Sequence, residues 1–217
     1  AVGRTQEMLF HLSALHMKGK LPQQTVFLDS PMAIEVTQLY SEYIELLDAE
    51  DLKRLSTRFG DDPRKLLPAL TFTKNTEDSM AINRVKGGAV IIAGSGMCNG
   101  GRIRHHLKHN LWREECHIVF PGFQAKGTLG RQLVDGEKKV KMLGSTFAVK
   151  AKIHTLGGFS AHAGQCELLE WAGKFTTRPR FFLVHGEADA LQVLQQKLFR
   201  DKGITAEVPA EGSSIVF

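Results

Sequence analysis

The segment AVIIAGSGMCNGG (residues 89–101) decides the fold class of this chain. Its first five residues form a short apolar run, typical of a strand buried on both faces of a parallel sheet. A Gly-rich loop follows, a helix is expected to start near Arg102, and a second apolar strand is expected over residues 116–120. Strand, loop, helix and strand in this order make a βαβ unit. The sequence therefore predicts an α/β fold with a parallel sheet flanked by helices.

The same alternation continues on both sides of this unit. Apolar periodicity and turn residues predict helices over 4–18, 32–47, 77–86, 165–174 and 190–201, and strands over 25–28 and 181–184 with a further strand at the C-terminus. Asp29 or Ser30 is expected to cap the second helix, with Pro31 at its first position. Residues 48–75 are charged and interrupted by prolines, which indicates a short helix and a loosely packed excursion. Residues 138–155 alternate around Gly144, as in an antiparallel hairpin.

Composition limits the class of protein. The chain has 217 residues, 42% of them hydrophobic, a formal net charge of +5 and a pI near 9.2. The basic balance favours a polyanionic partner, although it could serve only solubility. The sequence has no apolar run long enough for a bilayer and no signal peptide, so no membrane partner is expected. Its three cysteines form no C-x-x-C pair, which argues against a zinc ribbon and for a reduced, cytoplasmic setting.

Two Gly-rich loops could receive phosphate. The first, residues 94–101, lies where a strand meets a helix, and backbone amides at such a place bind anions. It matches neither the dinucleotide fingerprint nor the P-loop, and its glycines could serve only a tight turn. The second, residues 124–131, follows a strand end, where open α/β sheets bind ligands.

The helix after the first loop carries many basic side chains. They suit a phosphodiester chain, or else form a solvated helix face, and the three histidines could also suggest a metal site although no carboxylate supports them. The residues are Arg102, Arg104, His105, His106, Lys108 and His109.

Two further histidines stand among small residues at element ends, in FSAHAG (159–164) and LVHGE (183–187). An accessible histidine held in this way can ligate zinc or move a proton near neutral pH. A dinuclear zinc site needs more carboxylates and histidines than these two motifs contain.

Five segments in series resemble the motifs of β-CASP ribonucleases of the metallo-β-lactamase superfamily. They are VFLDSPMA (26–33), AGSGMCNGGR (93–102), GFQAKGTLGR (122–131), GGFSAHAGQ (157–165) and LVHGE (183–187). The resemblance covers essentially the whole chain in the correct order. It implies a parallel-sheet β-CASP domain inserted into an αββα lactamase domain, with RNA in the cleft between them and two zinc ions that activate the attacking water.

The resemblance also implies roles for particular residues. His162 matches the motif B histidine that assists the leaving oxygen or stabilises the scissile phosphate, and His185 matches the motif C zinc ligand. A histidine at that last position is the RNA-processing version of the pattern. Residues expected along the RNA path are Arg4, Ser30, Ser95, Gly96, Arg102, Lys126, Arg131 and Ser160.

The chain departs from the family pattern in one respect: it contains no His-x-His-x-Asp-His motif. Together with the start at Ala1, this leads us to expect a fragment, with the β-CASP domain over residues 1–157 and the returning lactamase segment over 158–217. The zinc-binding N-terminal half of the lactamase domain would then be missing. We expect two Zn²⁺ in the full-length enzyme, no tightly bound metal in this chain alone, and no hydrolysis by it alone.

Two other functions remain open at this stage. One is a non-catalytic module that binds single-stranded RNA through the Gly-rich loop and the basic helix. The other is a scaffold that forms a homodimer, which the sequence neither supports nor excludes.

Overall fold

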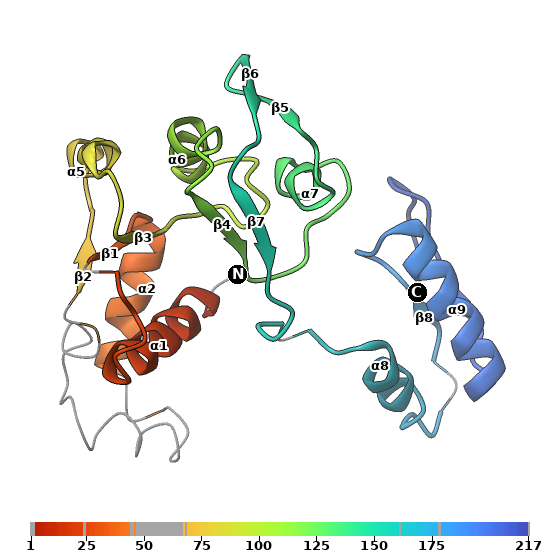
Figure 1. Ribbon diagram of the computed structural model, residues 1–217. Helices are drawn as coiled ribbons and strands as arrows, with labels where there is room; N and C mark the ends of the chain where they lie inside the picture. The colour runs from red at the N-terminus through yellow and green to blue at the C-terminus, as the bar shows by residue number, and fades with distance from the viewer. Residues whose placement is uncertain are drawn as a thin grey trace. The chain divides into compact units, whose positions relative to one another are not determined.

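The computed structural model describes residues 3–23, 25–43, 46, 67, 69–160, 162–177 and 179–216. The chain divides into two compact units, residues 1–160 and 161–217 (Figure 1). The two units are separated by how compactly their residues pack, which does not identify a domain family. The assignment of residues 158–217 to a lactamase domain therefore remains a prediction. None of the described helices is long and apolar enough to cross a membrane.

A three-stranded parallel sheet begins the first unit. Strands β1 (Thr25–Leu28), β2 (Leu70–Phe72) and β3 (Ala89–Ile92) lie in the order β2-β1-β3. Helices α1 (Arg4–Met17) and α2 (Pro31–Glu42) accompany them. Apolar side chains of both helices and of β1 share one core, whose buried members are Leu9, Leu12, Val26, Leu28, Ile34 and Leu67. The predicted α/β class with a parallel sheet is confirmed.

Strand β2 lies inside the stretch for which the sequence predicted a loose excursion, so the prediction is wrong for residues 70–72. β2 has only three residues, of which the middle one is exposed and the other two are half-buried. An alternation this short cannot be recognised in a sequence. The rest of that stretch as far as residue 66, and the predicted end of the second helix at residue 47, lie outside the described residues.

The remainder of the first unit packs around a second core. Strands β4 (His117–Phe120) and β7 (Lys152–Thr155) pair in parallel, and the helices are α5 (Thr76–Ala81), a 3₁₀ turn at Ile82–Arg84, α6 (Ile103–Asn110) and α7 (Leu129–Val134). The fully buried side chains of this core include Leu107, Leu111 and Leu133. The strand predicted over residues 116–120 is present as β4, but it pairs with β7 and not with β3, so the predicted βαβ unit does not lie within one sheet.

The predicted hairpin is confirmed over β5 (Lys139–Met142) and β6 (Ser145–Ala148), which pair antiparallel. Leu143 and Gly144 form its two-residue turn with φ of 49° and 77°, the combination that a type I′ turn requires. The prediction is wrong for Ile153, which lies in β7 and pairs in parallel with Ile118. Alternation predicts the two faces of a strand but not its partner, which here comes from a distant part of the chain.

The second unit contains α8 (Gln165–Ala172), β8 (Phe181–Phe182), α9 (Ala188–Lys202) and β9 (Ala206–Glu207). β8 and β9 pair in parallel, and Leu169, Ala172, Leu198 and Ala206 form a small core. Gly203 ends α9 in the left-handed conformation that favours glycine. The two helices and the strand predicted from residue 181 are confirmed, with ends shifted by at most two residues, and the further strand is β9, which ends ten residues before the C-terminus.

Candidate functional site

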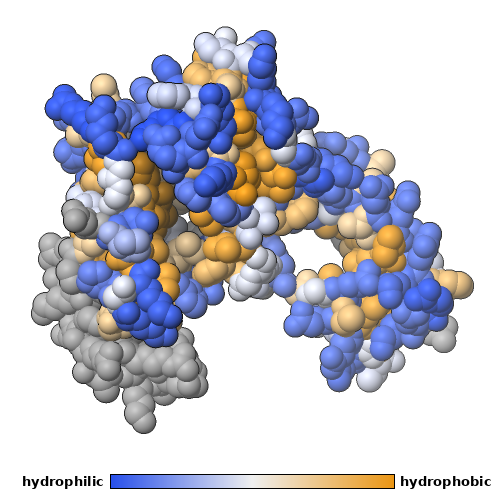
Figure 2. Space-filling model, in the orientation of Figure 1, coloured by the Kyte–Doolittle hydropathy of each residue, from blue (hydrophilic) through white to orange (hydrophobic). Residues whose placement is uncertain are grey.

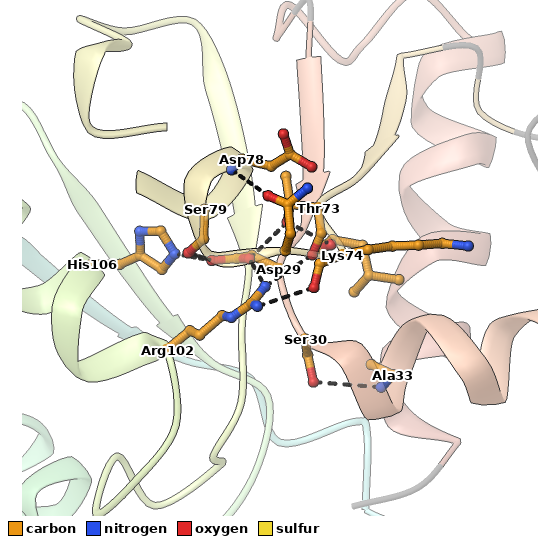
Figure 3. A network of polar contacts seen from close by, with 11 residues as sticks. Asp29, Ser30, Ala33, Thr73, Lys74, Asp78, Ser79, Arg102 and His106 are labelled. Atoms are coloured by element: carbon orange, nitrogen blue, oxygen red, sulfur yellow. Dashed lines mark hydrogen bonds and ion pairs between the residues drawn. The ribbon is translucent and has the colours of Figure 1, made fainter. Parts of the chain in front are cut away.

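A buried carboxylate lies where the three strands of the first sheet end. Asp29 directly follows β1 and is 0% exposed. Its Oδ1 accepts hydrogen bonds from Thr73 Oγ1 and Arg102 Nη1, both at 2.7 Å, and its Oδ2 accepts from Ser79 Oγ at 2.7 Å and lies 2.6 Å from His106 Nε2 (Figure 3). Asp29 thus joins residues that follow β2, belong to α5 and open α6.

This network stabilises the ionised form of the Asp29 carboxyl group. Burial by itself raises the pKa of its carboxyl, but the hydrogen bonds from Ser79, Thr73, His106 and Arg102 together bring the pKa below its ordinary value. The carboxylate is therefore ionised near neutral pH and needs the donor from His106. Nδ1 of the same imidazole is buried without a partner among the described residues.

Arg102 is held by this network as well. Besides Asp29, its guanidinium donates to the carbonyl oxygens of Thr73 at 2.9 Å and of Lys74 at 3.1 Å. The side chain is 22% exposed. The expected contact of Arg102 with RNA remains a prediction, but the structure shows that this arginine orients the start of α6. Hydrophilic residues dominate the visible face of α6 in the space-filling view (Figure 2).

The first Gly-rich loop closes tightly on itself. Ser95 Oγ lies 3.2 Å from the amide of Gly100, and Gly94 O accepts from the amide of Ile103 at 3.0 Å. Gly101 has φ of +71°, and a Cβ there would collide with the carbonyl of Gly94. Glycine is therefore required at position 101 for the turn itself. In the described part of the chain the amides of the exposed Gly96 and its neighbour Met97 have no acceptor, so this loop can still receive an anion.

The second Gly-rich loop is fastened to the first. Gly130 N donates to Met97 O at 3.0 Å, Leu129 N donates to Asn99 Oδ1 at 3.1 Å, and Thr128 Oγ1 caps the amide of Arg131 at 3.2 Å. The first amides of α7 are thereby satisfied within the chain. The structure brings the two predicted phosphate loops together, but it leaves the start of α7 unavailable to a phosphate.

The other expected RNA contacts differ in what they touch. Arg131 Nε donates to both carboxylate oxygens of Asp135, at 2.8 and 2.9 Å, on the same helix. Lys126 lies exposed at the tip of the second loop. Ser30 is the N-cap of α2 and accepts from the amide of Ala33 at 3.4 Å, which settles the choice between Asp29 and Ser30 as the cap.

Arg4 brings the start of the chain to the segment before Ser160. Its Nε donates to the carbonyl oxygen of Phe159 at 3.1 Å, and its guanidinium lies against Gly122, where a Cβ would be 2.7 Å from Nη1. On the next turns of α1, the ring of His11 meets the ring of Phe159 edge-on at 5.3 Å. Three segments far apart in sequence thus converge at Arg4, which bonds the residue that precedes the exposed Ser160.

In the second unit, His162 and His185 are both exposed. His162 precedes α8, and the loop between them is braced by Glu167 Oε2, which accepts from the amide of Gly164 at 2.6 Å. His185 has φ of +61°, a conformation that few residues other than glycine adopt. It is followed by Gly186, where a Cβ would lie 2.7 Å from Leu191 of α9. Close packing on α9 therefore shapes the loop that presents His185.

The described ranges of the chain include no cluster of side chains that could serve as a zinc site. A catalytic zinc needs about three protein ligands, and no group of three or more His, Cys, Asp or Glu side chains in the described ranges is placed to hold a metal ion. The alternative of a metal site on α6 is not supported either, because His106 is buried against Asp29 while His105 and His109 are exposed.

Sequence reasoning missed the central position of Asp29 and the burial of His106. It treated the first as a candidate cap and the second as part of a basic run. The available signal was a carboxylate directly after a buried strand, which is costly unless donors surround it. The donors lie 44 to 77 residues away, so no local pattern reveals them.

Comparison with known families gives two matches. Residues 5–133 match the Beta-Casp domain model, and residues 146–209 match the model described as a Zn-dependent metallo-hydrolase RNA specificity domain. The first match alone covers more than half of the chain.

Curated relatives agree with these matches. The chain is 42% identical over 200 residues to Ribonuclease TTHA0252 of Thermus thermophilus, which covers 91% of this chain and 44% of the relative. It is 32% identical over 206 residues to Transcription termination factor FttA of Methanosarcina mazei (92% and 32%), and 26% identical over 216 residues to an RNase J-like protein of Methanocaldococcus jannaschii (98% and 48%). The chain thus spans less than half the length of each of these relatives.

Proposed function

This chain belongs to the metallo-β-lactamase/β-CASP family of RNA-processing ribonucleases, and from that premise we propose that it is part of an enzyme that hydrolyses RNA phosphodiester bonds. The substrate is single-stranded RNA, in mRNA processing or degradation. The observation that carries the proposal is the convergence at Arg4, which bonds the carbonyl of Phe159, directly before Ser160, and lies against Gly122. Such an arrangement suits a phosphate near Ser160, because a guanidinium binds phosphate through paired N–H donors.

In this proposal the chain contributes binding and proton transfer. Arg4 and the open amides of the first Gly-rich loop hold the RNA backbone, together with Lys126 and with Ser30, Ser95, Arg102 and Arg131 as further contacts along its path. His162 protonates the leaving oxygen or stabilises the scissile phosphate. A positioned general acid or base of this kind contributes about 10²–10⁴ in rate.

In this proposal His185 is the zinc ligand that this chain contributes. A zinc ion bound there would supply an activated water, with its remaining ligands in a part of the whole protein outside these 217 residues. Because one imidazole cannot hold such an ion, we propose that this chain alone binds no zinc tightly and does not cut RNA. A cytoplasmic location stays part of the proposal.

The test uses the whole protein that contains this chain. His162→Ala should retain zinc and lose cleavage of a single-stranded RNA by about 10²-fold or more. His185→Asn should lose zinc, and asparagine is chosen because it tolerates the positive φ of this position. His16→Ala, at the exposed end of α1, is the matched control and should change neither zinc content nor rate.

Full cleavage by the His162→Ala protein would contradict the assigned role, and metal-dependent cleavage by the 217-residue chain alone would contradict its inactivity. If the whole protein binds RNA but never cuts it, the alternative of a non-catalytic RNA-binding module becomes the better account.

A further inference from the structure

Residues 146–154 alternate between exposed and at least half-buried side chains, although they run from one strand, β6, into another, β7. The inner side chains are half-buried or buried, and they pack in the second core of the first unit. They are Phe147, Val149, Ala151 and Ile153. Every residue between them is exposed. Lys152 and His154 are two residues apart in β7, so they lie on its outer face, and the exposed Lys150 precedes the bend at Ala151 that leads into β7.

Strand β5 adds two lysines on the outer side of the hairpin. Lys139 and Lys141 are exposed, whereas Val140 and Met142 between and beside them are buried. Their cross-strand partners are Ala148 and Thr146, which are too short to cover or neutralise an ammonium group. Hydrophilic residues line β5 in the space-filling view (Figure 2).

Strand β4 adds His117. Its Nδ1 lies 2.8 Å from Nε2 of His154, with the two rings within 10° of parallel. One imidazole donates and the other accepts, so the pair ties the outer side chains of β4 and β7 together. We call the six outer residues the basic ribbon: His117, Lys139, Lys141, Lys150, Lys152 and His154.

The charges of the basic ribbon are largely uncompensated. In the described ranges one ion pair involves its lysines, between Lys150 Nζ and Glu114 Oε1 at 3.2 Å, and both of these side chains are more than half exposed. An exposed pair of this kind contributes little. The ribbon therefore presents lysines that attract a polyanion.

The spacing of these charges suits an extended strand of phosphates. Lys139 and Lys141 are two residues apart on one face of β5, and Lys152 and His154 are two residues apart on one face of β7, which is about 7 Å in each case. The ribbon contains no Phe, Tyr or Trp on which a base could stack, so the contact would be with the backbone of the nucleic acid.

We propose that the basic ribbon is a binding surface for the phosphate backbone of single-stranded RNA, which it holds in addition to the cleavage site. This inference rests on the proposed function for the identity of the polyanion. It predicts that the ribbon acts on long RNA, which can reach both places, and not on a short oligomer held at the cleavage site alone.

The experiment compares Lys139→Ala/Lys141→Ala with Lys18→Ala/Lys20→Ala in the whole protein. The control pair is also exposed and removes the same charge, at the end of α1. Affinity is measured by fluorescence anisotropy over a range of salt in a His162→Ala background, with labelled oligouridines of about 6 and about 30 nucleotides. The ribbon variant should bind the long RNA about 10-fold more weakly, with a salt slope lower by about 1–2, while the control and the short RNA stay unchanged.

Lys139→Arg/Lys141→Arg keeps the charge and should restore binding of the long RNA, which separates the electrostatic role from a folding defect. Equal affinity and salt slope for the ribbon variant and the unsubstituted protein would overturn the inference. The lysines would then serve only to keep an exposed hairpin edge from pairing with other chains. Cleavage of the short RNA by the protein with His162 intact is scored separately, so failure of the proposed function is distinguishable from failure of the ribbon.

Discussion

Nε2 of His106 lies 2.6 Å from Oδ2 of Asp29, although the two residues are 77 positions apart in the chain. The contact connects the middle of α6 to the end of β1 and places the Gly-rich loop that precedes α6. The loop that could receive a phosphate is therefore supported by a buried carboxylate that would itself repel a phosphate. Arg102 lies 2.7 Å from Asp29 Oδ1 and compensates its charge.

Replacement of Asp29 by Asn should destabilise the first unit. The change leaves the shape of the side chain but removes the charge that Arg102 and His106 share, and breaking a buried pair costs about 3–5 kcal/mol. The free energy of unfolding in urea measures the effect. Asp78→Asn, exposed in α5 beside Ser79, should cost well below about 1 kcal/mol. Equal effects of the two changes would contradict the central role of Asp29.

The contribution of Asp29 should disappear in acid. Its pKa is lower in the folded chain than the ordinary value of 3.8, so ionised Asp29 stabilises the fold fully above that value. The contribution falls as the pH drops through the folded pKa. The difference in unfolding free energy between the unsubstituted protein and Asp29→Asn should stay constant from about pH 5 to 8 and shrink below about pH 4. If the difference in unfolding free energy grew in acid, the pKa of Asp29 would be raised by folding and not lowered, and the prediction would be wrong.

Gly101→Ala should disrupt the first Gly-rich loop. The substitution puts a Cβ at φ of +71° and against the carbonyl of Gly94, and the backbone conformation alone costs about 1–2 kcal/mol. Gly100→Ala is the control, because a Cβ there meets nothing within 4 Å. Thermal denaturation should show a lower Tm for the first variant and little change for the second. RNA affinity should fall in the same order.

Leu143→Asn should stabilise the hairpin by about 0.5–1 kcal/mol. Leu143 adopts φ of 49° in a two-residue turn and is 39% exposed. Asn-Gly is the favoured sequence for this turn, and a branched apolar residue is not. Leu143→Ala removes the same side chain without this benefit and should not stabilise. A chemical denaturation series of the three proteins decides the point.

The cysteines should differ in reactivity. Burial raises the pKa of the Cys98 thiol to about 11, and the residue is 2% exposed, whereas Cys166 is exposed. Iodoacetamide near pH 8 should therefore modify Cys166 and spare Cys98, because the thiolate is the reactive form. Peptide mass mapping with a Cys166→Ser control identifies the site. Rapid labelling of Cys98 in the folded protein would indicate that its core opens readily.

Local sequence determined most of the elements. The apolar run at 89–92 formed a buried strand, Ser30 and Pro31 started α2, and the alternation near Gly144 formed a hairpin. Each of these depends on residues within a few positions of one another, through side-chain periodicity, capping or turn geometry. The order of the five motifs was likewise enough to identify the family.

Tertiary structure decided what no neighbouring residue could indicate. It paired β7 with β4 instead of with the hairpin, added β2 to the first sheet, buried His106 against Asp29 and placed Arg4 at Phe159. The physical reason is the same in each case. A strand partner, and the donors that make a buried charge tolerable, are selected by proximity in the folded chain, and that proximity joins residues 35 to 155 positions apart.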